Sequence, residues 1–67
     1  MWIIARMRGD YSEWSKDLNR IDRAGKWTEY GQGFPLQFDK YSRANNEKKR
    51  QMEKDPDWEY EVMEYNR

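Results

Sequence analysis

The side chains that could carry chemistry in this chain are carboxylates, lysines, arginines, tyrosines and tryptophans, because the sequence contains no histidine and no cysteine. That composition excludes a disulfide scaffold, a zinc finger, a thiol nucleophile and a His-dependent catalytic triad. Carboxylates are abundant, but nothing in their spacing marks a buried pair for acid–base catalysis. A chain of 67 residues also seldom encloses a substrate pocket between its own elements. We therefore expect a protein that is not an enzyme and holds no cofactor.

One group of carboxylates has a spacing that suggests a metal. Asp55, Asp57 and Glu59 occupy alternate positions, which resembles the opening of a calcium-binding loop. The glycine that such a loop needs at its sixth position is Tyr60 here, and the following residues alternate like a strand. The pattern therefore predicts the end of a helix followed by a strand with an acidic face, and no metal site.

Some residues of the sequence favour nucleic-acid binding and others argue against it. Gly33–Phe38 resembles the Gly-Phe-x-Phe-Val-x-Phe core of the third-strand motif of the RNA-recognition family, with Trp2 at the position of the first-strand aromatic residue. The resemblance implies a sheet on which bases stack. However, Pro35 and Gln37 would then occupy the stacking face, and the glutamates of the last strand would repel phosphate. Thirteen basic and thirteen acidic residues also cancel, so no net field attracts a polyanion. Nucleic-acid binding is therefore the alternative function.

The elements that must position these residues follow from periodicity and turn signals. Gly9 ends a first alternating segment, Asp10 with Glu13 forms a capping box for a helix, and Gly31 with Gly33 supplies a tight reversal. Asp39 or Ser42 can cap a second helix, which Pro56 ends. The expected elements are a strand at 1–8, a helix at 11–24, a hairpin of strands at 26–30 and 34–38, a helix from about 39 to 54, and a strand at 57–65.

This β-α-β-β-α-β order predicts a small α+β protein with a ferredoxin-like, or split βαβ, arrangement. We expect residues 1–67 to form a single domain with a four-stranded antiparallel sheet, two helices on one face and the other face open. If Lys26–Tyr30 is a loop instead, the alternative is a three-stranded α+β sheet.

An open sheet face would gather side chains that are common at protein–protein contacts. Five residues are expected on it, and they are the predicted partner-binding site: Trp2, Ile4, Arg6, Met63 and Tyr65. Such an apolar patch is seldom left unused by a monomer, so we expect it to contact another protein or to form a homodimer seam.

A secondary basic patch is expected on the second helix. Arg43, Arg50 and Lys54 fall on one side of it at helical spacing, together with Glu47. Residues 39–54 carry six basic and three acidic side chains, whereas residues 55–65 carry five acidic and no basic ones. This dipolar layout could orient an encounter with a charged partner.

The combined prediction is a small non-enzymatic protein-interaction module that binds and inhibits or redirects another protein. Chains of this size and character resemble the accessory proteins of bacteriophages, which act on host proteins. A protein partner is expected, nucleic acid ranks second, and a structural subunit acting by self-association is the third hypothesis. No apolar run is long enough to span a bilayer and there are no cysteines, so we expect no membrane contact and a reducing, cytoplasmic compartment, which would be the host cytoplasm for a viral protein.

Overall fold

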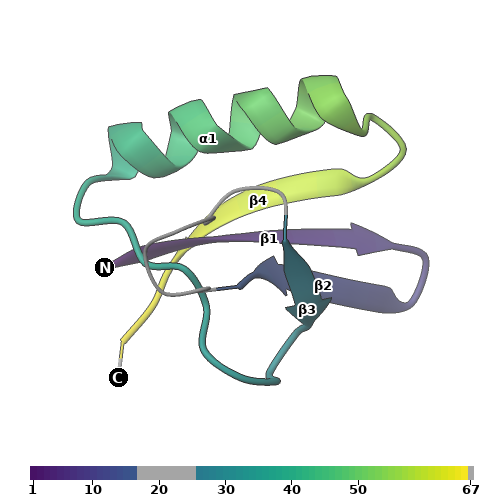
Figure 1. Ribbon diagram of the computed structural model, residues 1–67, viewed down its shortest axis with the longest axis horizontal. Helices are drawn as coiled ribbons and strands as arrows, with labels where there is room; N and C mark the ends of the chain where they lie inside the picture. Colours follow the sequence, from purple (N-terminus) through teal and green to yellow (C-terminus); the bar gives the residue numbers. More distant parts are fainter. Residues whose placement is uncertain (17–25, 67) are drawn as a thin grey trace.

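A computed structural model describes residues 1–16 and 26–66 of the chain. In this part of the chain, four antiparallel strands form one sheet in the order β3-β2-β1-β4, and a single helix packs against it (Figure 1). The structure is a small α+β fold, but the expected β-α-β-β-α-β order, and with it the ferredoxin-like arrangement, is wrong. The elements are β1 (Trp2–Arg8), β2 (Tyr11–Ser15), β3 (Trp27–Glu29), α1 (Tyr41–Lys54) and β4 (Glu59–Glu64).

The first correction concerns the segment after β1, which turns back as a strand instead of starting a helix. Arg8 pairs with Tyr11, so only Gly9 and Asp10 lie between β1 and β2. Gly9 has a φ of 62°, the positive value that the tight turns of two-residue hairpins need at their first position and that glycine adopts without a Cβ penalty. Asp10 is therefore a turn residue and not a helix cap. Residues 17–24 of the expected helix lie outside the described residues.

The second correction concerns the expected hairpin. Trp27–Glu29 is a strand, so the three-stranded alternative is also wrong, but it pairs with β2. Gly31 and Gly33 have positive φ values of 93° and 67° and reverse the chain, as predicted. The returning segment makes only isolated bridges, from Pro35 to Lys16 and from Phe38 to Trp2. Proline has no backbone N–H to give to a ladder, which prevents a regular strand at this position.

The helix and the last strand are confirmed as elements. α1 ends at Lys54 because the residue before Pro56 avoids helical backbone angles. Neither of the expected caps is used, since Lys40 precedes the first turn with an extended backbone and no side-chain hydrogen bond. The side chains that α1 buries are Ala44 and Gln51.

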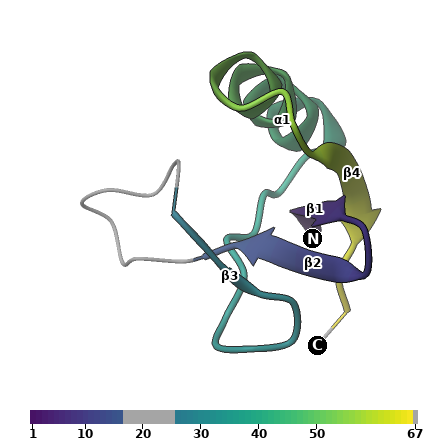
Figure 2. The ribbon, with the colours of Figure 1, turned by 90° about the vertical axis from the view of Figure 1, so that its right-hand side faces the viewer.

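Both faces of the sheet are covered, which corrects the expectation of an open face (Figure 2). On one side α1 packs over β1 and β4 (Figure 1), and the contact of Trp2 with Tyr41 of α1 shows that the buried Ile4, on the same face of β1 as Trp2, also lies on this side. On the other side residues 30–32 fold back over Trp14, whose indole N–H donates to the carbonyl of Gln32 at 2.9 Å. In residues 1–16 and 26–66, the buried apolar side chains are Ile3, Ile4, Ala5, Trp14, Leu36 and Ala44, together with Pro35.

Candidate functional site

The sheet register separates the five residues expected to share one open face. Residues directly opposite in an antiparallel pair lie on the same face, and Met63 is opposite Ile3. Met63 and Tyr65 therefore lie on the face away from α1, whereas Trp2, Ile4 and Arg6 lie on the α1 side. The expectation of a common open surface is wrong, because both groups are packed beneath other segments.

On the α1 side, the predicted residues form part of the interior. Ile4 is completely buried, and the half-buried Trp2 meets the ring of Tyr41 edge-on, with ring centroids 5.2 Å apart. On the opposite face, the ring of Tyr65 lies 5.8 Å from that of Trp14, and the Tyr30 hydroxyl contacts the sulfur of Met63 at 3.5 Å. These contacts give Trp2 and Tyr65 a packing role, and partner binding by any of the five predicted residues stays a prediction.

Arg6 stands at the centre of a cluster that sequence reasoning missed. Its guanidinium lies 4.1 Å from the ring centroid of Trp27 and 4.1 Å from that of Trp58. This is cation–π geometry on two indoles at once. The Nε–H group donates to Glu13 Oε1 at 2.9 Å, and a terminal nitrogen lies 2.7 Å from the same oxygen. The Arg6 side chain is only 12% exposed, so its charge is neutralised within the structure.

A second layer completes this cluster. The Arg8 guanidinium lies 4.3 Å from the ring centroid of Trp58, whose indole N–H donates to Asp55 Oδ2 at 3.0 Å. The Tyr11 hydroxyl donates to Glu13 at 2.8 Å, and this hydrogen bond raises the pKa of Tyr11 above its ordinary value of 10.0. We call this group the Arg6 stack: Arg6, Arg8, Glu13, Trp27 and Trp58. Its polar groups mostly satisfy one another, so it holds the sheet together.

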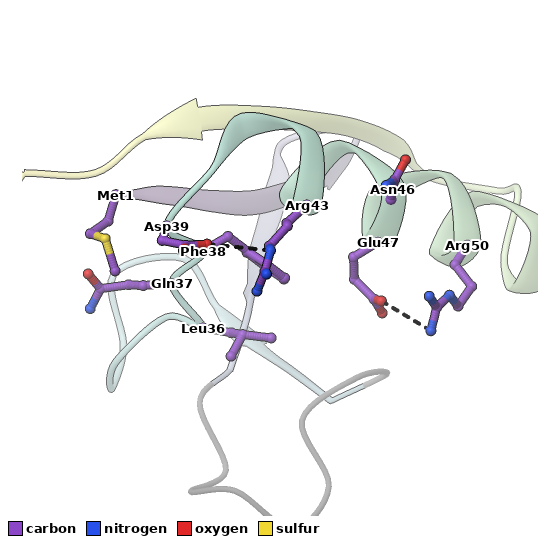
Figure 3. A pocket seen from close by; sticks show the side chains of 9 residues that line it. All are labelled: Met1, Leu36, Gln37, Phe38, Asp39, Arg43, Asn46, Glu47 and Arg50. Carbon is purple, nitrogen blue, oxygen red and sulfur yellow. Dashed lines mark ion pairs between the residues drawn. The ribbon is translucent and has the colours of Figure 1, made fainter.

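A groove lies between α1 and the segment that leads into it (Figure 3). Its volume is about 560 Å³. The buried Leu36 and half-buried Phe38 give it an apolar base, and Figure 3 shows Arg43, Glu47 and Arg50 projecting from α1 along its length. We call it the α1 groove, and it is lined by Met1, Leu36, Gln37, Phe38, Asp39, Arg43, Asn46, Glu47 and Arg50.

The two arginines of the α1 groove are loosely held. Arg43 and Arg50 side chains are both 69% exposed. Arg43 Nε lies 3.8 Å from Asp39 Oδ1, and an Arg50 terminal nitrogen lies 3.6 Å from Glu47 Oε1. Both distances exceed the roughly 2.7–2.9 Å of a charge-assisted hydrogen bond. Toward the described residues, most of their N–H donors are therefore available to a ligand.

Part of the predicted basic patch thus lines the α1 groove. Arg43 and Arg50 line it together, while the exposed Lys54 lies at the end of α1 and outside the lining. Helical spacing was enough to place the two arginines on one side of the helix. The apolar base was missed because residues 34–38 were assigned to a hairpin strand. The Arg6 stack was missed because pairing Arg6 with Glu13 requires the Gly9 turn.

The alternating carboxylates do not form a metal site. Asp55 accepts the hydrogen bond from Trp58, and in residues 1–16 and 26–66 no group of three or more His, Cys, Asp or Glu side chains could hold a metal ion. Among the described helices, none combines the length and apolar character that crossing a membrane requires.

Comparison of the chain with models of known protein families, with curated proteins and with solved structures finds no match. The geometry of the molecule is therefore the ground for a functional proposal.

Proposed function

We propose that the protein is a non-enzymatic protein-interaction module whose α1 groove takes an apolar and acidic segment of another protein. The observation that carries this proposal is the pairing of an apolar base at Leu36 and Phe38 with two exposed arginines, Arg43 and Arg50, that have N–H donors to spare. Arginine, methionine and aromatic residues are enriched at protein–protein contacts, and all three types occur here.

The chemistry of the lining favours a protein segment over a nucleic acid. Arginine guanidiniums bind carboxylates as two parallel hydrogen bonds, and the apolar base can take a side chain from the same segment. Asp39 and Glu47 also line the α1 groove, so they would repel a continuous run of phosphates, whereas a peptide can place single carboxylates at the arginines and neutral residues beside these two acids. The chain as a whole has no net charge to attract a polyanion. Nucleic-acid binding through Arg43 and Arg50 therefore remains the second candidate.

Occupying another protein's surface in this way would inhibit or redirect that protein. The role of a phage-type accessory protein stays a prediction in the same sense, since it depends on which partner is bound.

The proposal is tested by capture from lysate with three tagged proteins: the wild type, R43Q/R50Q and K48Q/K49Q. The last variant removes the same charge from the same helix at positions that do not line the α1 groove. Circular dichroism checks that all three fold equally. We expect one stoichiometric protein that the wild type and K48Q/K49Q retain and that R43Q/R50Q loses.

Two results would contradict this function. Equal retention by all three proteins would show that the α1 groove is not the contact. Loss of the captured material after nuclease treatment, or a steep log-linear weakening with salt, would favour the nucleic-acid alternative.

A further inference from the structure

β4 lies at the margin of the sheet, with β1 on its inner side and no strand beyond it in the described part of the chain (Figure 2). Backbone groups of an antiparallel strand point alternately toward one neighbour and the other. The Tyr65 N–H donates to the carbonyl of Met1 at 2.7 Å, so the odd-numbered residues of β4 point toward β1. The N–H and C=O groups of Tyr60, Val62 and Glu64 must therefore point outward.

The other side of β1 supports this assignment. The Trp2 N–H donates to the Phe38 carbonyl at 2.8 Å, and the Trp2 carbonyl accepts from the Phe38 N–H at 2.7 Å. The backbone N–H and C=O of this even-numbered residue of β1 therefore point away from β4. β1 is thus used on both sides, whereas β4 is hydrogen-bonded to a described strand on one side only. A six-residue edge whose outward donors and acceptors pair with no described strand is a template for another strand.

Charge decides which strand could pair there. Residues 55–65 carry five acidic and no basic side chains, and on β4 itself Glu59, Glu61 and Glu64 are all exposed. Two copies of the chain pairing edge to edge would bring these glutamates together, and opposed like charges destabilise a strand pair. An incoming strand with lysine or arginine at alternate positions would instead meet opposite charges.

We propose that the β4 edge, Glu59–Glu64, binds an extended basic segment of a partner protein by strand addition. Main-chain hydrogen bonds at Tyr60, Val62 and Glu64 supply the pairing, and basic side chains beside Glu59 and Glu61 supply the selectivity. This surface is separate from the α1 groove and would attract the opposite charge, so it does not depend on the function proposed above.

The test uses synthetic peptides of eight residues with alternating lysine and valine, labelled for fluorescence anisotropy. One matched control replaces each lysine by the uncharged glutamine, which suits neither the β4 edge nor the arginines of the α1 groove. A second keeps the lysines but carries N-methyl groups on alternate backbone nitrogens, which removes ladder donors without changing charge. Glu59→Gln with Glu61→Gln alters only exposed side chains of the edge, and R43Q/R50Q serves as the control at the α1 groove.

We expect the lysine peptide to bind the wild type at least about tenfold more tightly than either control peptide, as two or three favourable cross-strand pairs would give. E59Q/E61Q should lose most of this difference, and R43Q/R50Q should keep it. Equal binding of the N-methylated peptide would reduce the effect to simple charge attraction and overturn strand addition. Undetectable binding of the lysine peptide, or a wild-type homodimer that E59Q/E61Q strengthens, would also overturn it.

Discussion

The Arg6 stack on the sheet and the arginines of the α1 groove place the same residue type in opposite surroundings. Arg6 is 12% exposed, has Glu13 within 2.7 Å and lies between two indoles. Arg43 and Arg50 are 69% exposed, and their nearest described carboxylates are 3.8 and 3.6 Å away. The three arginines carry the same formal charge. They differ greatly in how many N–H groups remain available to a ligand.

The difference shows how a chain with few aliphatic residues extends a small aliphatic interior with half-buried aromatic rings. Aromatic residues are 16% of the sequence, and a buried aromatic ring contributes roughly 150–250 Å² of surface. Stacking Arg6 between Trp27 and Trp58 lets the molecule pack a long side chain while Glu13 neutralises its charge. An arginine used in this way stabilises the fold, and only arginines outside such a cluster remain for binding.

The largest effect should come from breaking the Arg6 stack at its centre. Arg6→Ala leaves the mostly buried Glu13 carboxylate without its cationic partner, which we expect to lower the free energy of unfolding by about 3 kcal/mol. Arg6→Lys should recover only a small part, because an ammonium group cannot form the fork and stack together. Urea denaturation measures both. If Arg6→Ala lowers the free energy of unfolding by less than about 1 kcal/mol, the Arg6 stack does not contribute substantially to stability.

A smaller loss is expected at the edge of the same cluster. Trp58 is half-buried, so Trp58→Ala should cost about 2 kcal/mol, less than a fully buried tryptophan. Trp58→Phe keeps a ring beside Arg6 but removes the hydrogen bond to Asp55, and about 1 kcal/mol should be lost. The same denaturation experiment checks the order of the two variants. Equal losses would mean that the indole N–H matters more than the ring.

The α1 groove should respond in the reverse way. R43Q/R50Q removes two exposed and loosely held charges, so the free energy of unfolding should change by no more than about 0.5 kcal/mol. Binding of the captured partner should nevertheless be lost. A large destabilisation would show that Arg43 and Arg50 stabilise the fold as Arg6 does. The two regions would then not differ in the role of their arginines.

The smallest effect is a pH dependence at the rim of the Arg6 stack. The hydrogen bond to Glu13 raises the pKa of Tyr11 above 10.0, so the folded protein holds this proton more tightly than the unfolded chain does. The stabilisation from Tyr11 is therefore complete below pH 10.0 and is lost as the pH rises through the higher folded-state pKa. Stability differences between wild type and Tyr11→Phe, measured in steps of pH, should be constant below pH 10.0 and shrink above it. A difference that grows with pH would contradict the hydrogen bond.

Several elements were predictable from the sequence because their signals are local. Alternation identified β1 and β4, Pro56 ended the helix, and Gly31 with Gly33 marked the chain reversal. The placement of Arg43 and Arg50 on one side of α1 needed only helical spacing. The charge contrast between residues 39–54 and 55–65 was also readable directly.

Other features were missed because two local patterns competed. Tyr11 and Trp14 have the spacing of a helix face, and the same residues also fit a strand in which they point to opposite sides. The Gly9 turn resolves this competition, since its hairpin pairs β2 with β1. With that hairpin in place, Glu13 faces Arg6.

Local sequence signals were enough to predict β1, α1 and β4, to exclude histidine and cysteine chemistry, and to separate the basic helix from the acidic strand. The face of the sheet that α1 covers, and the arginine that packs against two tryptophans while others stay exposed, depend on contacts between distant segments. The physical reason is that strand alternation places a residue on one of two faces but does not say which face will be covered. Contacts between distant segments make that choice, as when residues 30–32 fold over Trp14 and leave α1 to cover Ile4.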